Sequence, residues 1–345
     1  MTARRAHRFR ASRALIGVGK LVAVVLIVEF LLLPQLAGSN KSWQLLADVD
    51  NVWLIPALVL EAASLLVYAL LTWLLIPAEY RPRYGRTLRI DLSTLAASHV
   101  LPAGSAVGLG LGYRLLTQAG VPGRAAATAK ATQAVGSAAV LNGVLVAALI
   151  GSIASSGFTS VYGLAVGAGL ALIVIAGAAA ILLVRNDEGI AAWIARLLGH
   201  IPRVSEQTVH TAVLGAASYL DELGGDRGLM AKAATVALLN WLLDAAALWM
   251  CVRAFGPSVS VTGLMVSYGV ANVLAAIPLL PGGLGVVEAF LIPSLVGFGV
   301  PRAEAILGVL AWRVVNFVLP IPVGLGAYLS LPGRRDGPAA DPPAE

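Results

Sequence analysis

Long apolar segments are the feature that most limits what this chain can fold into. They run from about Ala14 to Leu33, Val52 to Ile76, Ala131 to Ile150, Val161 to Val184, Ala233 to Val252 and Ala305 to Leu329. About 20 residues of α-helix cross a hydrocarbon core of roughly 30 Å. Because a spanning segment must satisfy its backbone hydrogen bonds internally, each run predicts a transmembrane helix.

The composition agrees with a membrane protein and excludes several other classes. Of 345 residues, 58% are hydrophobic and only 12% are charged, whereas a soluble domain carries about 25% charged residues. This excludes a soluble enzyme, a disordered protein and a nucleic-acid-binding module. One cysteine, Cys251, and four scattered histidines give no disulfide and no metal-ligand spacing, so neither a metal nor a cofactor is expected.

Positive charges predict the orientation of the chain. Eighteen Lys and Arg residues fall in segments 1–13, 77–91, 119–130, 185–232 and 330–345, against two in segments 34–51, 151–160, 254–260 and 298–304. Cytoplasmic loops carry the excess of Lys and Arg. We therefore expect a multi-pass protein of the cytoplasmic membrane with both termini in the cytoplasm. The basic N-terminus is 1–13, the transmembrane domain 14–330, and 331–345 a disordered tail.

Two apolar stretches do not fit simple spans. Residues 91–118 are interrupted at LPAG, with Pro102 and Gly104, and residues 261–299 are interrupted by PLLPGGLG at 278–285. Proline and glycine break helices. Both stretches predict hairpins that enter the membrane and turn back, although 261–299 could instead form two short spans.

The two interruptions are related by one offset. LPAGSAV at 101–107 matches LPGGLGV at 280–286, and GVPGRAA at 120–126 matches GVPRAEA at 299–305, both 179 residues apart. Together with the charge-based topology, this predicts two halves of opposite orientation, about 14–150 and 161–330, with the cytoplasmic loop 185–232 in the second. The predicted fold is all-α and polytopic. It has six full spans plus two broken hairpins, up to eight counted spans, and an inverted-topology internal repeat. Such repeats place substrate sites near the bilayer midplane.

Eight charges fall inside the apolar segments: Lys20, Glu29, Glu61, Arg114, Asp244, Arg253, Glu288 and Arg313. Buried charges of this kind often mark functional sites, whereas Lys20 and Arg253 lie near span ends and are expected to extend toward the interface. A purely structural alternative is an ion pair of Arg313 with Glu288 or Asp244 that locks helices together.

Several polar residues share a helix face with these charges. Asn240 lies four residues before Asp244, and Asn316 lies three residues after Arg313. His99, just before LPAG, could titrate near neutral pH or simply pack in the core. GLGLG at 108–112 follows no predicted strand and is therefore not interpreted as a nucleotide-binding loop.

The segment PLLPGGLGVVEA at 278–289 resembles the membrane domain of lysylphosphatidylglycerol synthases and their stand-alone relatives. Further resembling stretches lie at 101–120, 240–256 and 312–324, so the resemblance covers about residues 15–330. It implies a lipid-translocating, flippase-like domain. It places functional weight on Pro281, Gly282, Gly283, Gly285, Glu288 and Arg313, and Arg114 matches an Arg common after the first hairpin. Only a short tail follows Leu329, so synthase activity is not expected.

The sequence therefore favours a lipid transporter for an anionic phospholipid or a polyprenyl-linked lipid. The predicted lipid-binding residues are Pro102, Gly104, Arg114, Asn240, Asp244, Pro281, Gly282, Gly283, Gly285, Glu288, Arg313 and Asn316, with Glu61 and His99 as coupling candidates. Arg114 and Arg313 would contact phosphate, and Glu288 and Asp244 a cationic group or a proton. Two alternatives stay open: a small-solute or ion transporter, and a non-transporting membrane partner of a glycosyltransferase or lipid-modifying enzyme. The expected partners are membrane lipids and not nucleic acid, and the oligomeric state is open.

Overall fold

The computed structural model describes residues 49–101, 104–156, 226–256, 259–275, 283 and 285–331. The predicted spans at 14–33 and 161–184, most of the 185–232 loop, the basic N-terminus and the C-terminal tail lie outside the described residues. So do the predicted site residues Pro102, Pro281 and Gly282.

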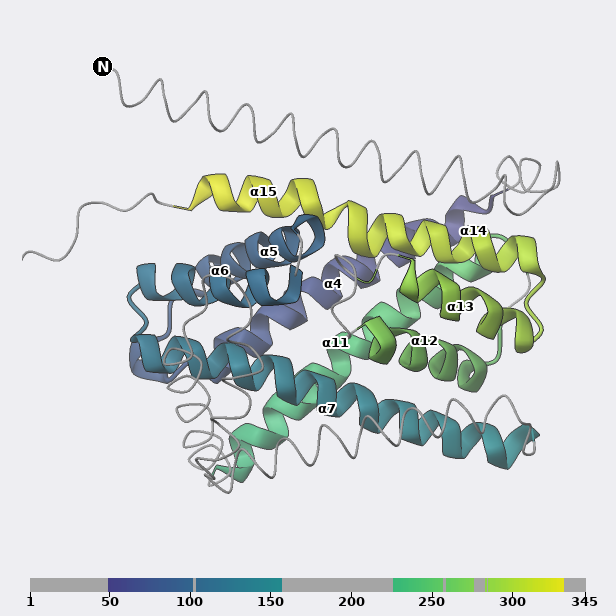
Figure 1. Cartoon of the computed structure of the whole chain (residues 1–345), viewed down its shortest axis with the longest axis horizontal. Coiled ribbons are helices and arrows are strands. Elements are labelled where there is room, and N and C mark those ends of the chain that lie inside the picture. Colours follow the sequence, from purple (N-terminus) through teal and green to yellow (C-terminus); the bar gives the residue numbers. More distant parts are fainter. Residues whose placement is uncertain are drawn as a thin grey trace, which may run out of the picture.

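The described chain is helical throughout (Figure 1). Its elements are α4 (Asn51–Leu75), η2 (Ala78–Tyr80), α5 (Tyr84–Val100), α6 (Gly104–Gln118), α7 (Gly123–Ser156), α11 (Arg227–Arg253), α12 (Val261–Ala275), α13 (Val286–Gly297), α14 (Arg302–Arg313), η4 (Val314–Val318) and α15 (Pro320–Ser330). Asp50 caps α4 by accepting a hydrogen bond from the Val52 amide, and Asp226 caps α11 in the same way through the Leu229 amide.

Four apolar segments are long enough to cross a membrane: Asn51–Leu75, Gly123–Ser152, Arg227–Arg253 and the continuous run Arg302–Ser330. They confirm the spans predicted at 52–76, 131–150, 233–252 and 305–329. The last run is not a uniform α-helix, because one π-helical turn, η4, interrupts it between α14 and α15. Such turns often occur at functional sites.

Both predicted interruptions are present. We call α5 and α6 hairpin 1, and α12 and α13 hairpin 2. Residues 101–103 separate the helices of hairpin 1, whereas α12 ends at Ala275 and α13 begins at Val286. With 15 and 12 residues, α12 and α13 are each shorter than the roughly 20 residues that a full crossing needs. Both interpretations of 261–299, a hairpin or two short spans, therefore remain predictions.

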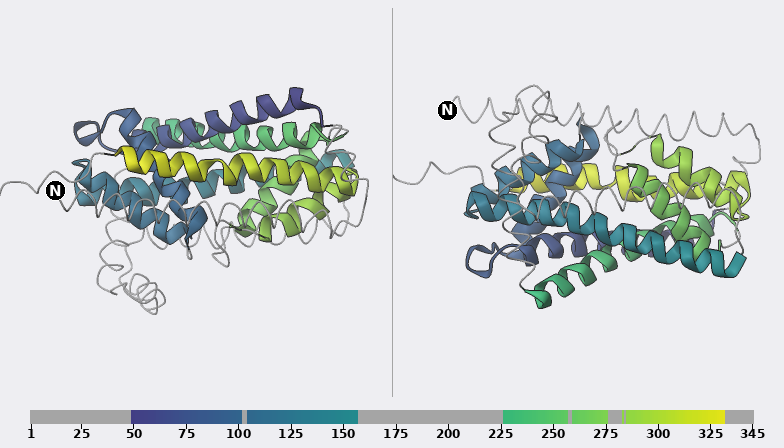
Figure 2. Two further views of the ribbon diagram at one scale, coloured as in Figure 1. Left: turned by 90° about the horizontal axis from the view of Figure 1, so that it is seen from above. Right: turned by 60° about the horizontal axis from the view of Figure 1, so that its bottom comes forward.

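The two hairpins lie at opposite ends of the long axis of the molecule, as both views show (Figures 1 and 2). The long helices α4 and α11 run antiparallel and pack closely against each other. α7 begins at residue 123 and α14 at residue 302, which is again an offset of 179. Hairpin 1 packs through α5 against α15, and hairpin 2 packs through α12 against α7. Each hairpin thus contacts the closing helix of the other half, the arrangement that an inverted repeat predicts.

A row of glycines brings the two helices of hairpin 1 together. Gly104, Gly108 and Gly112 are four residues apart and lie on one face of α6. A Cβ atom at Gly104 would overlap the carbonyl group of Ser98, and one at Gly108 would lie 3.1 Å from the Ser98 Cβ atom. Small residues at this spacing let helices approach closely in membranes. Within GLGLG, Gly108 and Gly112 therefore lie on the packing face of α6, whereas Gly110 has open space around it.

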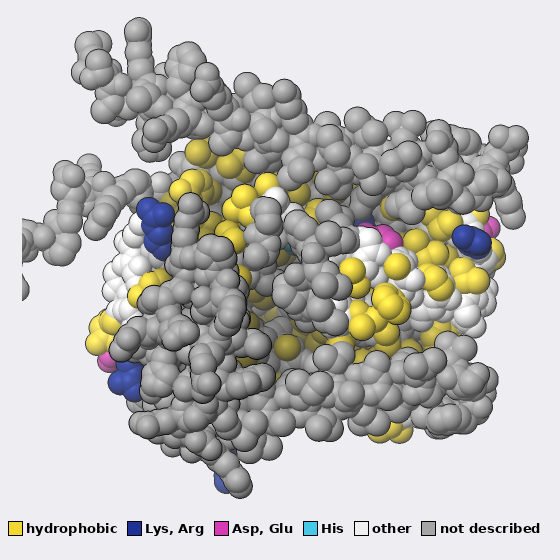
Figure 3. Space-filling model, in the orientation of Figure 1, with side chains coloured by type: hydrophobic (Ala, Val, Ile, Leu, Met, Phe, Trp, Pro, Cys, Tyr) yellow, Lys and Arg dark blue, Asp and Glu magenta, His cyan; other side chains and the backbone are white. Residues whose placement is uncertain are grey.

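The side chains on the visible face are distributed as expected for a protein that spans a membrane (Figure 3). Most described side chains on this face are hydrophobic, and most of the visible Lys and Arg side chains lie toward the end of the bundle at which α4 ends and α5 begins. Arg81, Arg83, Arg86 and Arg89 lie at that junction. The described basic residues are thus concentrated at one end, as the charge-based topology predicts.

Candidate functional site

The turn of hairpin 2 is held by a buried arginine. Gly283 and Gly285 have positive φ angles of 66° and 80°, a conformation that glycine adopts at little cost. Glu288 accepts a hydrogen bond from the Gly285 amide through Oε2 (2.8 Å) and from Arg313 Nε through Oε1 (2.5 Å). Arg313 Nη2 also donates to the Gly283 carbonyl oxygen (3.1 Å).

The Glu288–Arg313 ion pair predicted as a structural alternative is therefore present. The side chains of Arg313 and Glu288 are only 3% and 8% exposed. Arg313 uses its guanidinium group on the turn of hairpin 2, so in this structure it does not present a free guanidinium to a lipid phosphate.

Next to this turn, two carboxyl groups share one amide donor. Asp244 on α11 accepts hydrogen bonds from Tyr268 Oη (2.7 Å), Trp312 Nε1 (2.7 Å) and Asn316 Nδ2 (3.1 Å). The same Asn316 nitrogen lies 3.2 Å from Oε1 of Glu61 on α4. We call these five residues the carboxyl cluster. It joins α4, α11, α12, α14 and η4, and it brings together three residues that the sequence predicted for the site.

Asn240 takes a different partner, although it shares a face of α11 with Asp244. Its Nδ2 atom donates to the carbonyl oxygen (3.1 Å) and hydroxyl group (2.7 Å) of Ser64 on α4, and the Ser64 hydroxyl donates back to the Asn240 carbonyl oxygen (3.3 Å). This reciprocal contact fastens α4 to α11 beside the carboxyl cluster.

His99 connects the tip of hairpin 1 to the π-helical turn. Its Nδ1 atom lies 3.1 Å from the Phe317 carbonyl oxygen, and its ring stacks on the Phe317 ring with centroids 4.2 Å apart. This packing role is one of the two interpretations given for His99. Arg313, which holds hairpin 2, ends the helix that leads into the same turn. The segment α14–η4–α15 thus contacts both hairpin breaks.

Arg114 is not brought to this region. It lies on the exposed surface of α6, and its carbonyl oxygen accepts a hydrogen bond from the Thr117 hydroxyl (2.9 Å). Arg253, expected near a span end, donates to the Gly256 carbonyl oxygen (2.8 Å) and lies over the Trp53 ring. Among the described residues, no group of three or more His, Cys, Asp or Glu residues could hold a metal ion.

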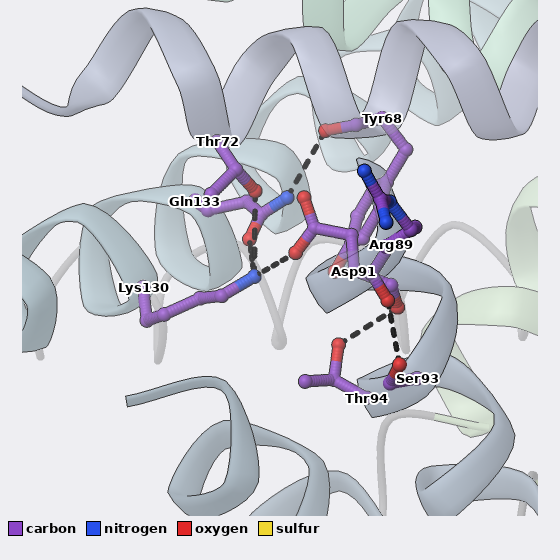
Figure 4. Close-up of polar contacts among 8 residues, drawn as sticks. All are labelled: Tyr68, Thr72, Arg89, Asp91, Ser93, Thr94, Lys130 and Gln133. Atoms are coloured by element: carbon purple, nitrogen blue, oxygen red, sulfur yellow. Dashed lines mark hydrogen bonds and ion pairs between the residues drawn. The ribbon is translucent and has the colours of Figure 1, made fainter. Parts of the chain in front are cut away.

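A second buried polar cluster was missed by the sequence interpretation (Figure 4). Lys130 Nζ on α7 donates to Oδ1 of Asp91 on α5, to Gln133 Oε1 (2.9 Å) and to Oγ1 of Thr72 on α4 (3.3 Å). The side chains of Lys130 and Asp91 are only 6% and 2% exposed. We call these four residues the lysine cluster.

The sequence interpretation had assigned Asp91 and Lys130 to the ends of loops 77–91 and 119–130, which is wrong. Both lie about two turns inside their helices, because α5 begins at Tyr84 and α7 at Gly123. Apolar runs mark only the most hydrophobic part of a helix, and the first turns of α5 and α7 are polar. The GVPG turn at 120–123, followed by a helix-forming Ala-rich segment, was the available signal for an earlier start of α7.

An apolar groove lies beside η4. It has a volume of about 540 Å³ and lies between the first turns of α4 and the segment α14–η4–α15. Its lining includes Leu54, Ile55, Leu58, Leu310, Val314 and Leu319. Ile55, Leu58 and Leu319 are also exposed, so the groove opens sideways toward the surroundings of the bundle.

The family model described as "Lysylphosphatidylglycerol synthase TM region" matches residues 18–324. The chain belongs to this family. The family match agrees with the resemblance that PGGLGVVE and the Arg313-containing helix suggested. The membership establishes a membrane protein of this type.

Curated relatives match over shorter stretches. The chain is 31% identical over 99 residues to the inner membrane protein YbhN of Escherichia coli, covering 28% of this chain and 29% of the relative. It is 30% identical over 89 residues to a UPF0104 membrane protein of Methanothermobacter thermautotrophicus, covering 26% and 27%. Another match to a protein of that description and organism is 24% identical over 144 residues, covering 41% and 43%. Each match thus spans less than half of the relative.

Proposed function

We propose that the protein translocates a lipid with an anionic headgroup, either a phospholipid or a polyprenyl-linked lipid, between the leaflets of the cytoplasmic membrane. The main observation that supports this proposal is that both hairpins contact the same interrupted helix, α14–η4–α15. Helix breaks leave backbone groups that lipid cannot satisfy, so such breaks lie against protein or a polar path. Here the break region carries buried polar side chains from both halves.

The apolar groove favours a lipid over a small polar solute. Its aliphatic lining suits an acyl or polyprenyl chain, and its sideways opening admits one from the bilayer. Val314 of the groove is the first residue of η4 and Leu319 follows its last, and η4 also carries Asn316 of the carboxyl cluster. A lipid chain in the groove would place its headgroup near these polar residues.

The roles proposed for individual residues follow from their present partners. Asn316, Asp244 and Glu61 would face the headgroup or carry a coupling proton, since they lie beside the groove-lining turn. Arg114, exposed on α6, would meet phosphate near the basic end of the bundle. Arg313 and Glu288 would shape the turn of hairpin 2. In this proposal the N- and C-termini are cytoplasmic, the two halves span 14–150 and 161–330, and the protein is not itself an enzyme.

Leaflet exchange in vesicles tests the proposal. The purified full chain would be placed in vesicles of phosphatidylethanolamine and phosphatidylglycerol that contain fluorescent phosphatidylglycerol, and the dye in the outer leaflet would be chemically quenched. We expect the protected fraction to fall faster than in empty vesicles. Asp244→Asn with Glu61→Gln should slow the exchange, whereas Val323→Ala, at an exposed position of α15, should not.

The outcome that overturns the proposal is exchange no faster than in empty vesicles for the phosphatidylglycerol probe and for a fluorescent polyprenyl phosphate. A non-transporting partner of a lipid-modifying enzyme would give that result. A small-solute transporter would also leave lipid exchange unchanged, but vesicles that contain it would take up a solute.

A further inference from the structure

The lysine cluster ties hairpin 1 to the rest of the bundle through one side chain. Lys130 extends from α7 past α6 to reach Asp91 on α5 and Thr72 on α4. A Cβ atom at Gly112 of α6 would lie 2.9 Å from Lys130 Cε. The glycine therefore leaves the space through which the lysine passes. Loss of the Lys130–Asp91 contact would remove the ion pair that joins α5 to α7, whereas α5 would still contact α4, for example through Tyr84 Oη, which donates to the Leu66 carbonyl oxygen (2.7 Å).

The two carboxylates that hold the hairpins differ in how fully they are used. Glu288 of hairpin 2 has a hydrogen-bond donor on each oxygen, Arg313 Nε and the Gly285 amide. Asp91 of hairpin 1 has Lys130 on Oδ1, whereas its Oδ2 atom is buried without a hydrogen-bond partner. A buried acceptor without a donor costs free energy, and Oδ2 is the oxygen at which a proton can bind and neutralise the carboxylate.

A second polar atom without a hydrogen-bond partner lies on the same face of α5. Thr87 is four residues before Asp91 on α5, so the two side chains are neighbours on one helix face. Its Oγ1 atom is also buried without a partner. Asp91 is seven residues from the start of α5 at Tyr84, or about 10 Å along the helix axis. The basic end of the bundle is therefore the nearer side for proton entry.

We infer that Asp91 is a proton-binding site that controls the attachment of hairpin 1. A proton from hydronium forms one O–H bond at Oδ2 and leaves a water molecule behind, with no electron transferred and no other reactant. The neutral carboxylic acid then holds the Lys130 ammonium group only weakly, and hairpin 1 separates from α7. Hairpin 2 does not respond in this way, because a guanidinium group stays charged and Glu288 has no oxygen free.

The surroundings of Asp91 contain few other titratable groups. α7 contributes Lys130, α4 contributes Tyr68, and α5 itself contributes Tyr84, the two tyrosines lying within electrostatic range of Asp91. Arg89 of α5 also lies beside Asp91 (Figure 4), and its guanidinium group donates to the Gly85 and Ser330 carbonyl oxygens. The one charged residue of α6 is Arg114, which is exposed, and α15 has no Asp, Glu, Lys, Arg or His residue. Among these groups, the Asp91 carboxylate is the one that can gain a proton below neutral pH.

If the protein transports lipid, a proton at Asp91 would release hairpin 1 during transport, and this consequence rests on the proposed function. The site itself does not, because its test measures the protein without lipid transport. Proton binding can therefore fail while leaflet exchange succeeds, and the reverse.

Infrared difference spectroscopy of the full chain in lipid films tests proton binding. As the pH is lowered, the wild type should gain a protonated-carboxyl band that Asp91→Asn lacks. The bands of Glu61, Asp244 and Glu288 remain in the variant as internal references. Identical difference spectra for the two proteins would overturn the inference.

Hydrogen–deuterium exchange, corrected for the intrinsic pH dependence of exchange, tests the attachment of hairpin 1. In the wild type, lowering the pH should speed exchange of α5 and α6 amides about tenfold or more, and leave α12 and α13 unchanged. Asp91→Asn should exchange fast at every pH. The uncharged pair Asp91→Asn with Lys130→Met, which leaves no buried charge to unfold the bundle, should show no pH response. Equal pH responses of hairpins 1 and 2 in the wild type would overturn the inference.

Discussion

Hairpin 1 and hairpin 2 occupy similar places in the order of helices, before α7 and before α14, yet different cations bind them to the bundle. In hairpin 2, Arg313 of α14 binds a carboxylate and a carbonyl group of the glycine turn. In hairpin 1, Lys130 of α7 binds a carboxylate well away from the break, on the helix that leads into it. The predicted repeat does not extend to these polar residues: Ala134 stands where the offset of 179 would place Arg313, and Val309 where it would place Lys130.

This difference indicates which half is the better candidate for movement. An arginine with every contact matched to a folded turn makes a fixed support, whereas a lysine on a carboxylate with one unused oxygen makes a contact that one proton can weaken. Four predictions address this comparison, beginning with the largest expected effect.

Removing Arg313, the cation that binds hairpin 2, should cause the largest loss of stability. Arg313→Met leaves Glu288 buried without its charge partner and the Gly283 carbonyl oxygen without a donor, a loss of about 3–5 kcal/mol in the free energy of unfolding. Equilibrium unfolding in mixed micelles measures this. Adding Glu288→Gln should recover part of the loss, and Arg302→Met, at an exposed position of the same helix, should change little. A wild-type stability for Arg313→Met would show that hairpin 2 does not depend on this contact.

Exchanging the two cations should cost about 1–3 kcal/mol in each half, for different reasons. Arg313→Lys loses the planar fork that reaches both Glu288 and Gly283. Lys130→Arg brings a bulkier group into the space beside Gly112, where the lysine Cε atom already lies close. Unfolding in mixed micelles again gives the values. If both exchanges are neutral, the two attachments are chemically equivalent and the comparison fails.

Replacing glycines of α6 by alanine should lower the stability at Gly104 but not at Gly110. Gly104→Ala drives a methyl group into the Ser98 carbonyl group, for a loss of about 1–3 kcal/mol. Gly110 has open space around it, so Gly110→Ala should be neutral or slightly stabilising, because alanine favours helix. Thermal unfolding of the two variants beside the wild type gives the contrast. Equal effects would mean that the close approach of α5 and α6 is not what Gly104 provides.

The contact between hairpin 1 and η4 should be the weakest of the four. His99→Ala removes one hydrogen bond to the Phe317 carbonyl oxygen and one ring stack, worth about 1 kcal/mol. His99→Phe keeps the stack and should lose less. Thermal unfolding separates the two variants, and a larger loss for His99→Phe than for His99→Ala would show that the stack is not stabilising.

Much of this fold could be predicted because apolar length and helix-breaking residues are local signals. The spans at 52–76 and 233–252 and both breaks followed from residue type and spacing, and the Glu288–Arg313 pair was one of two ion pairs given as a structural alternative. The interruption at η4 could not be predicted in this way, since WRVVNFVLP is continuously apolar apart from Arg313 and Asn316, and a π-helical turn changes only which backbone groups pair.

The lysine cluster was missed for a related reason. Asp91 and Lys130 lie at the margins of apolar runs, where a charge that faces a loop and a charge that faces the core have the same sequence context. Only the packing of α5, α6 and α7 distinguishes the two cases. Which of the predicted residues share a cluster was also beyond the sequence, since Asn240 and Asp244 occupy one face but bind different partners.

The contact of α5 with α15 has a consequence for how the protein is made. Gly324 of α15 lies so close to the Leu92 carbonyl group that no side chain would fit there, and this contact joins a helix made early to the last helix of the bundle. At a synthesis rate of about 5–20 residues per second, the ribosome needs roughly 10–50 s to reach Gly324 after hairpin 1 has been made. During that interval hairpin 1 must be held by lipid, by the insertion machinery or by α4 and α7 alone. A ribosome that stops before residue 320 therefore leaves hairpin 1 without the helix that packs against Leu92.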